Sequence, residues 1–238
     1  MRKGIYLLPN SLTMCGMLAG FYAILASLKG DFVHSAWAIM IATIFDGLDG
    51  WVARLTNSTT RFGIELDSLS DVIAFGVAPA VMIYHYSLAE FGRIGWAASF
   101  LFVGCGALRL ARYNVQMGST EKKSFTGMPI PGAAAVVAST VLFYNVQKWQ
   151  AAGSHFVLIL IFVLSLLMVS TLKFHGAKEL NFRKRKPFWI LVAIILAFAV
   201  FIMQPEPALF AFLMIYLSVG IVENIYLYSK KPNAAILK

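Results

Sequence analysis

Eight apolar stretches recur along the chain, separated by polar connections, at about 5–28, 33–53, 68–89, 94–112, 130–147, 155–172, 188–204 and 207–228. A helix needs roughly 20 predominantly apolar residues to cross a bilayer, and within the hydrocarbon it must satisfy its own backbone polar groups. The pattern therefore predicts an all-α integral membrane protein with about eight transmembrane helices.

Composition supports this interpretation. Of the 238 residues, 59% are hydrophobic, and the mean hydropathy is +0.74. The core of one soluble domain of this length cannot absorb so much apolar side chain. Because no linker is long enough to separate soluble domains, we expect one membrane domain over 1–238.

The basic residues predict how the chain is oriented. Of the 20 Lys and Arg, all but Lys29, Arg93 and Lys148 lie on the N-terminal side of the membrane if the eight spans alternate in direction. Under the positive-inside rule both termini are cytoplasmic, and the protein is expected in the cell (inner) membrane. The net charge of +9 then reports topology, with contact to anionic membrane lipids as a secondary effect, and we expect no nucleic-acid partner.

Four aspartates interrupt the apolar pattern at the cytoplasmic ends of the second and third predicted spans. At 3.6 residues per turn, two helix faces collect the polar and small residues of this region: Asp46, Asp49, Gly50, Ala53 and Arg54 on the second span, and Gly63, Asp67 and Asp71 on the third. Carboxylates this close to hydrocarbon repel one another and are costly to desolvate unless cations balance them. The polar turn between the spans folds the two faces toward one another.

The chemistry of this cluster indicates a metal site for phosphate. Oxygen ligands without His or Cys suit Mg²⁺, Mn²⁺ or Ca²⁺, and four carboxylates on two facing helices can hold two such ions. Paired divalent ions clamp phosphate oxygens during phosphoryl transfer. Gly50 and Gly63 let a ligand approach the backbone, and Arg54 offers a forked donor to a phosphate.

The full spacing, Asp46-x2-Asp49-Gly50-x2-Ala53-Arg54-x8-Gly63-x3-Asp67-x3-Asp71, resembles the complete signature of the CDP-alcohol phosphotransferases, integral membrane enzymes of phospholipid synthesis. The resemblance covers about 5–175, the six-helix catalytic core of that family, and leaves two additional C-terminal helices at about 188–228. It implies a homodimer. The segment PNSLT at 9–13 also resembles the opening of the first helix in many members.

The resemblance assigns roles to individual residues. It implies that Asp46, Asp49, Asp67 and Asp71 bind a pair of divalent metal ions that hold the diphosphate of a CDP-linked lipid. Asp71 is also implied as the catalytic base that takes the proton of the acceptor hydroxyl. The residues implied to bind the CDP-lipid are Gly50, Ala53, Arg54, Gly63, Asn10 and Thr13.

Two further stretches, LRLARYNV at 108–115 and FTGMPIPGAAA at 125–135, resemble the phosphatidylserine synthase branch of this family. That resemblance implies transfer of the phosphatidyl group from CDP-diacylglycerol to the hydroxyl of L-serine, with CMP as the second product. Arg109 and Arg112 are three residues apart on one helix face, and a guanidinium suits the serine carboxylate. We predict that these two arginines bind serine, although both also fit the positive-inside pattern.

Several alternatives remain at this stage. Other members of the family use glycerol phosphate or inositol phosphate as the acceptor, or make cardiolipin. An intramembrane prenyltransferase also binds a diphosphate through aspartates, but it normally carries its two motifs on helices well separated in sequence, whereas here they share one hairpin. A divalent-cation transporter would have acidic residues near the bilayer midplane, whereas these are predicted at the cytoplasmic ends of two spans. The four histidines do not cluster and form no H-x-K motif, so we expect direct displacement without a phosphatidyl-enzyme.

Overall fold

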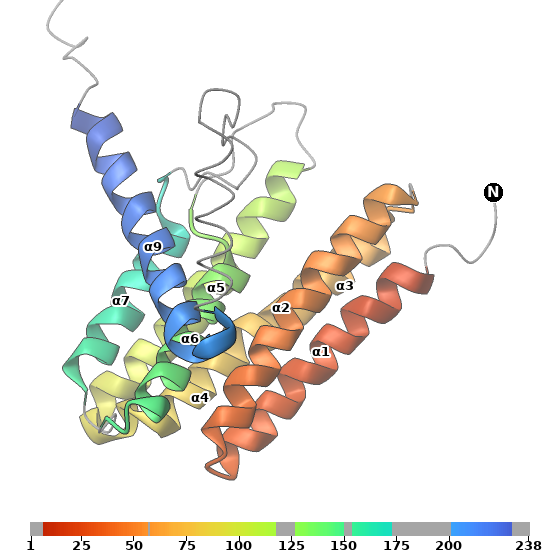
Figure 1. Cartoon of the computed structure of the whole chain (residues 1–238). Helices are drawn as coiled ribbons and strands as arrows, with labels where there is room; N and C mark the ends of the chain where they lie inside the picture. The colour runs from red at the N-terminus through yellow and green to blue at the C-terminus, as the bar shows by residue number, and fades with distance from the viewer. Residues whose placement is uncertain (1–6, 57, 118–126, 150–153, 173–200, 230–238) are drawn as a thin grey trace, which may run out of the picture.

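The computed structural model describes residues 7–56, 58–117, 127–149, 154–172 and 201–229. Every regular element within them is a helix (Figure 1): α1 Leu7–Leu28, α2 Phe32–Leu55, α3 Arg61–Asp71, η1 Val72–Val77, α4 Ala78–Tyr86, η2 Leu88–Phe91, α5 Arg93–Met117, α6 Ile130–Val146, α7 His155–Val169 and α9 Pro205–Ser229. The prediction of an all-α protein is confirmed.

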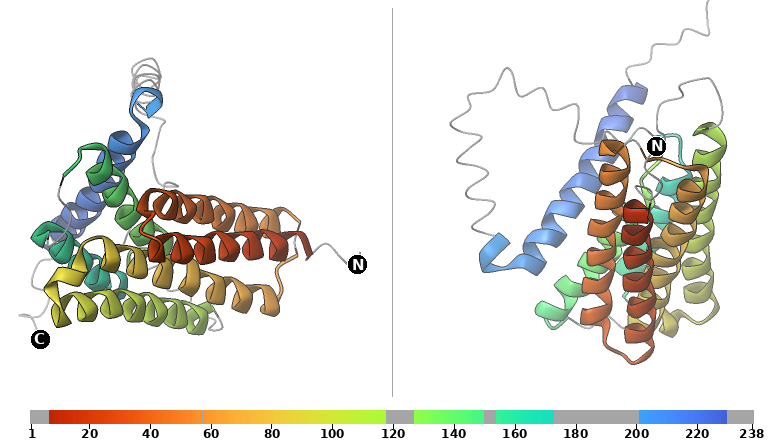
Figure 2. Two further views of the ribbon diagram at one scale, coloured as in Figure 1. Left: turned by 90° about the horizontal axis from the view of Figure 1, so that it is seen from below. Right: turned by 90° about the vertical axis from the view of Figure 1, so that its right-hand side faces the viewer.

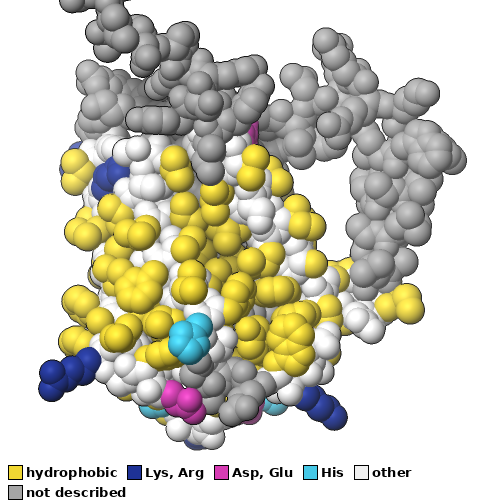
Figure 3. Space-filling view, turned by 90° about the vertical axis from the view of Figure 1, so that its left-hand side faces the viewer, with side chains coloured by type: hydrophobic (Ala, Val, Ile, Leu, Met, Phe, Trp, Pro, Cys, Tyr) yellow, Lys and Arg dark blue, Asp and Glu magenta, His cyan; other side chains and the backbone are white. Residues whose placement is uncertain are grey.

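Five helical segments are long and apolar enough to cross a membrane: Leu7–Leu28, Phe32–Leu55, Arg61–Tyr86, Arg93–Gln116 and Pro205–Asn224. Two shorter apolar helices, α6 and α7, accompany them. In Figure 3, hydrophobic side chains cover the middle of the visible face, and charged side chains lie toward its ends. The chain is therefore a multi-pass membrane protein. Of the eight predicted spans, only 188–204 lies largely outside the described residues, and the division into a six-helix core and two further helices stays a prediction.

The third span begins earlier than predicted. The apolar stretch starts at about residue 68, but the helix starts at Arg61, where the Thr60 hydroxyl caps it by accepting a hydrogen bond from the backbone N–H of Gly63 at 3.0 Å. The first two turns of α3 alternate polar and apolar residues, so a search for an apolar stretch misses them. The connection between α2 and α3 is correspondingly short, and α1 packs against both of these aspartate-bearing helices.

The span from Arg61 to Tyr86 contains one wide turn. Residues Val72–Val77 form the π-helical segment η1, and the backbone N–H of Ala78 donates to the carbonyl of Ile73, five residues back. Pro79 follows in the first turn of α4, where its missing N–H is tolerated. The helix continues through Pro79, and the wide turn directly follows Asp71.

Helix α1 lies against both halves of this hairpin region. It packs on α2, α3, η1 and α4, and its approach to η1 is very close: a Cβ atom added at Gly20 would lie 2.5 Å from the Cα of Ala74. Only glycine at residue 20 allows this spacing. The packing fixes the height of α1 relative to the turn that carries Asp71.

The remaining helices cover the other side of the bundle. Helix α6 is buried along most of its length, between α2, α4, α7 and α9, which explains why it is apolar on every side. Helix α9 crosses α6 at an incline (Figure 2), and Phe210 stacks on Phe143 with ring centroids 4.4 Å apart.

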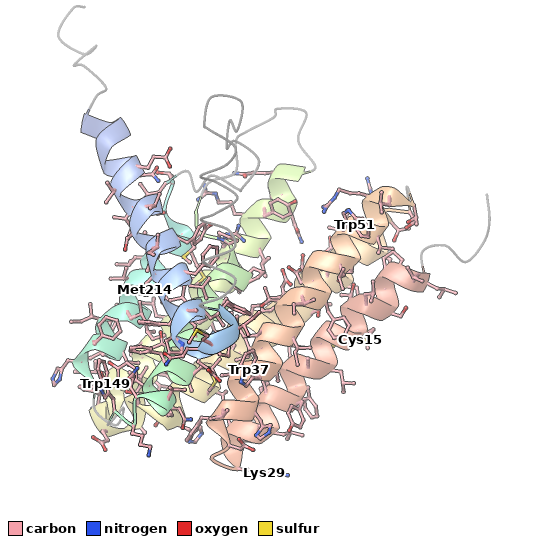
Figure 4. The ribbon with its side chains drawn as sticks, viewed as in Figure 1. Cys15, Lys29, Trp37, Trp51, Trp149 and Met214 are labelled. Atoms are coloured by element: carbon pink, nitrogen blue, oxygen red, sulfur yellow. The ribbon has the colours of Figure 1, made fainter. Side chains whose placement is uncertain are left out.

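Three residues show which connections lie at each end of the bundle. Lys29, in the turn between α1 and α2, and Trp149, after α6, are at one end, whereas Trp51 near the end of α2 is at the other (Figure 4). At the Lys29 end, Asp31 caps α2, and hydrogen bonds from the His34 side chain and backbone N–H lower the pKa of that exposed carboxyl. The three basic residues predicted on one side, Lys29, Arg93 and Lys148, all lie in or next to connections between successive spans.

Candidate active site

Four aspartates from α2 and α3 line one small cavity inside the bundle. Asp46, Asp49, Asp67 and Asp71 share its walls with Thr13 of α1. Asp46 and Asp71 are about 14–15 Å along the helix axis from the ends of α2 and α3 that face the connecting turn. The site is thus deeper than the helix ends at which the sequence pattern placed it, because α2 and α3 both extend beyond the apolar stretches.

Three of the carboxylates form a donor set for a hard cation. One oxygen each from Asp46, Asp49 and Asp67 lies within 4.8 Å of the other two. Oxygen ligands of a single divalent ion, bound at 2.0–2.6 Å, are at most about 5 Å apart. The residues present therefore fit a divalent metal ion.

Asp71 occupies a different position from the other three. It is outside the three-oxygen group, at the last residue of α3, and its carboxyl lies within hydrogen-bonding reach of the Asp46 carboxyl. It is 8% exposed, so this carboxyl is almost shielded from water. The structure brings all four predicted ligands together but makes Asp71 the one at the edge of the cluster.

Helix α1 supplies the hydrogen bonds that hold this arrangement. The hydroxyl of Thr13 is 2.7 Å from Oδ2 of Asp49 and 3.1 Å from the backbone carbonyl of Pro9. Because the hydroxyl has one proton and the carboxylate is the closer acceptor, Thr13 donates mainly to Asp49. Ser70 donates in turn to the carbonyl of Thr13 at 3.2 Å. Thr13 thereby links α1 to both α2 and α3.

A larger cleft of about 430 Å³ adjoins the acidic cavity and shares Thr13, Asp49 and Asp67 with it. Its walls include every residue predicted to bind the CDP-lipid, which are Asn10, Thr13, Gly50, Ala53, Arg54 and Gly63. A volume of this size is typical of a small-molecule site.

The two glycines of the cleft make room for polar side chains. A Cβ atom at Gly63 would lie 3.2 Å from Oδ1 of Asn10 and from the hydroxyl of Thr60. At Gly50 the same atom would lie 3.5 Å from the Arg54 guanidinium. Both glycines therefore keep polar side chains of the cleft close to the backbone, and the close approach of a ligand to them stays a prediction.

The cleft also contains residues that sequence reasoning did not single out. Tyr113 of α5 lines it, together with Ser58, Thr59 and Thr60 from the α2–α3 turn. Tyr113 belongs to the LRLARYNV stretch, but only the arginines of that stretch were considered for binding. The sequence predicts the polar turn between α2 and α3 only as a connection.

The two arginines predicted to bind serine have different surroundings. Arg109 is half-buried and interacts electrostatically with Asp71, and its Nε atom is buried with no hydrogen-bond partner among the described residues. Arg112 donates from a terminal guanidinium nitrogen to the backbone carbonyl of Val169, at 3.3 Å, where α7 ends. Arg109 thus interacts with an aspartate of the acidic cavity without lining that cavity, and Arg112 contacts the end of α7.

Comparison with known proteins agrees with this geometry. The CDP-alcohol phosphatidyltransferase family matches residues 6–167, close to the 5–175 covered by the predicted resemblance. A CDP-diacylglycerol–serine O-phosphatidyltransferase of Helicobacter pylori strain 26695 is 42% identical over 227 residues, which are 95% of this chain and 94% of the relative.

Two archaeal relatives are also similar over much of the chain. An archaetidylserine synthase of Methanothermobacter thermautotrophicus is 40% identical over 169 residues, 70% of this chain and 69% of the relative. A CDP-diacylglycerol–serine O-phosphatidyltransferase of Methanocaldococcus jannaschii is 36% identical over 172 residues, 72% and 75% of the two chains. With the signature aspartates gathered in one cavity, this chain belongs to the CDP-alcohol phosphatidyltransferase family.

Proposed function

We propose that this protein transfers the phosphatidyl group of CDP-diacylglycerol to the hydroxyl of L-serine and releases CMP. The observation that carries the proposal is the adjoining pair of sites, a cluster of metal-binding carboxylates that shares Asp49 and Asp67 with a cleft of nucleotide-diphosphate size. The names of the relatives, of which the first matches 95% of this chain, support serine as the acceptor.

Asp46, Asp49 and Asp67 would hold the divalent ions, with Asp71 as a further ligand at the edge of the cluster. Bound ions of this class neutralise the charge that develops on the departing CMP. Thr13 keeps the Asp49 carboxylate in one orientation through its hydrogen bond. Mg²⁺, Mn²⁺ and Ca²⁺ all accept oxygen ligands, so activity has to be compared with each of the three ions.

The remaining residues bind and orient the two substrates. Asn10, Gly50, Ala53, Arg54 and Gly63 receive the cytidine diphosphate in the cleft. In the reaction the serine oxygen bonds to the phosphorus next to diacylglycerol, the bond from that phosphorus to the CMP oxygen breaks, and the serine hydroxyl proton passes to the Asp71 carboxylate. A carboxylate within hydrogen-bond reach can do this because it raises the nucleophilicity of the hydroxyl.

The position of the site fits an enzyme with one lipid and one water-soluble substrate. The acyl tails stay in the bilayer, and serine and CMP exchange with water on the side that carries most basic residues. This side is the cytoplasmic face of the cell (inner) membrane, with both termini on it. The homodimer implied by the family resemblance stays a prediction.

The decisive experiment follows CMP release by the purified protein in lipid nanodiscs containing CDP-diacylglycerol. L-serine, glycerol 3-phosphate and inositol phosphate are compared, each with Mg²⁺, Mn²⁺, Ca²⁺ or a chelator. We expect CMP only when L-serine and a divalent ion are both present. CMP release with glycerol 3-phosphate in place of serine would retain the reaction class and overturn the acceptor. Metal flux into proteoliposomes without CDP-lipid, and no CMP release with any acceptor, would indicate a transporter instead.

A further inference from the structure

Two buried polar side-chain atoms lack a hydrogen-bond partner among the described residues, and both belong to α5. One is Nε of Arg109, a donor, and the other is Oδ1 of Asn114, an acceptor. A buried polar atom without a partner costs about 1–3 kcal/mol, so native proteins retain few of them. A donor and an acceptor of this kind on one helix, with the donor group interacting with Asp71, fit a ligand with groups of both types.

The orientation of the Asn114 amide follows from its neighbour. The Nδ2 atom of Asn114 lies 2.9 Å from the hydroxyl oxygen of Ser68. The proton of that hydroxyl is already donated to the carbonyl of Ile64 at 3.1 Å. Ser68 can therefore only accept from Asn114, which requires the amide nitrogen on this side and leaves Oδ1 for another donor.

Both side chains interact with α3. Arg109 interacts with Asp71, and Asn114 contacts Ser68, which is next to the metal ligand Asp67. Ser68 and Asp71 are three residues apart on α3, about 4.5 Å along the helix axis. The two residues therefore interact with the part of α3 that ends at Asp71, which the acceptor hydroxyl has to reach.

We propose that Asn114 is a specificity-determining residue that accepts a hydrogen bond from the ammonium group of an α-amino acid acceptor, while Arg109 binds its carboxylate. This inference rests on the proposed function and adds a requirement that the acceptor carry an ammonium group. Glycerol phosphate and inositol phosphate offer no such cation, so Asn114 discriminates against them.

The test compares L-serine with 3-hydroxypropionate, which has the same carboxylate and hydroxyl but no amino group. The KM for L-serine and the inhibition constant of 3-hydroxypropionate against L-serine are measured for the wild type, Asn114→Leu and Ser68→Ala. We expect Asn114→Leu to raise the KM for serine about 10- to 100-fold and to leave the inhibition constant of 3-hydroxypropionate and the KM for CDP-diacylglycerol within about twofold.

Ser68→Ala is the matched control, because it removes the partner of Nδ2 and leaves Oδ1 in place. It should change the KM for serine less than about threefold. An equal loss in Ser68→Ala and Asn114→Leu would overturn the inference, because the effect would then come from packing at the Ser68 contact. An equal loss for serine and 3-hydroxypropionate, or no loss for either, would overturn it as well.

A measurement on the wild type keeps the inference testable if Asn114→Leu does not fold. The wild type should bind L-serine at least about tenfold more tightly than 3-hydroxypropionate, and equal binding would overturn the role of Asn114. If the wild type releases no CMP with serine at all, the proposed function itself fails. That outcome is distinct, because it appears before any variant is compared.

Discussion

The acidic hairpin of α2 and α3 and the helix α6 both contain buried polar side chains, but these side chains form hydrogen bonds of opposite kinds. In α6 the hydroxyls of Ser139 and Thr140 donate to the backbone carbonyl of Val136, within the same helix. Around the aspartates the hydrogen bonds cross between helices, from Thr13 to Asp49 and from Asn114 to Ser68. A hydroxyl that donates to a carbonyl of its own helix needs no partner on a neighbouring helix. A hydrogen bond between two helices instead fixes the positions of the side chains that it joins.

Among the variants that test this contrast, the largest loss of activity is expected from a substitution of Asp71. Asp71→Asn removes the proton acceptor but leaves the three-oxygen cluster of Asp46, Asp49 and Asp67. We expect kcat to fall about 10²- to 10⁴-fold, the contribution typical of a general base, while the affinity for CDP-diacylglycerol changes little. Rapid-quench measurement of CMP release and equilibrium binding of the CDP-lipid separate the two quantities. A variant with near-normal turnover would assign the base to another group.

An intermediate effect is expected when a threonine hydroxyl is removed at the acidic site, with the same substitution in α6 as the control. Thr13→Val should weaken metal binding about 10- to 100-fold, as loss of a partner that orients a metal ligand typically does. Thr140→Val, also buried and bonded to a carbonyl four residues back, should leave metal binding unchanged. The readouts are the Mn²⁺ concentration for half-maximal CMP release and the Mn²⁺-induced rise in melting temperature without substrates.

Thr13→Ser keeps the hydroxyl and should restore most of the metal affinity. If Thr13→Val and Thr140→Val behaved alike, or if Thr13→Ser were as impaired as Thr13→Val, the cross-helix hydrogen bond to Asp49 would have no part in metal binding.

The smallest effect concerns the packing that positions the site. Gly20→Ala places a methyl group 2.5 Å from the Cα of Ala74, which should destabilise the fold by about 1–3 kcal/mol and lower activity because Ala74 is close to Asp71. Gly104→Ala on α5 meets no atom within 4 Å and should be neutral or slightly stabilising. Thermal unfolding in detergent compares the two variants. Equal melting temperatures would show that α1 and η1 can separate at no cost.

Much of the site could be predicted because its residues are close in sequence. Asp46, Asp49, Asp67 and Asp71 lie on two successive helices, so helical periodicity and one turn are sufficient to bring them together. Gly50, Ala53, Arg54 and Gly63 were predicted to bind the CDP-lipid from the same signature, and Asn10 and Thr13 from the PNSLT segment; all six line the cleft. The spans were predicted from hydropathy, which reports the apolar middle of a helix and misses its polar ends; the start of α3 at Arg61 was therefore placed seven residues too late.

Contacts between distant helices could not be predicted in the same way. The sequence assigned Thr13 to the CDP-lipid, and nothing in it indicates that the Thr13 hydroxyl reaches Asp49, 36 residues away. Asn114 and Ser68 are 46 residues apart, and their contact depends on the packing of α5 against the site. Arg109 and Arg112 share a spacing that suggested one role, but only the structure distinguishes the arginine beside Asp71 from the one at the end of α7.

The π-helical turn at Val72–Val77 has a consequence for comparing this chain with its homologues. A hydrogen bond that spans five residues encloses one residue more than an α-helical bond does. A homologue with one residue fewer in this window could keep both Asp71 and the buried face of α4 in phase by closing the turn to α-helical geometry. Alignments should therefore place single-residue gaps between 72 and 77, and a gap placed elsewhere in this span would rotate one flank by about 100°.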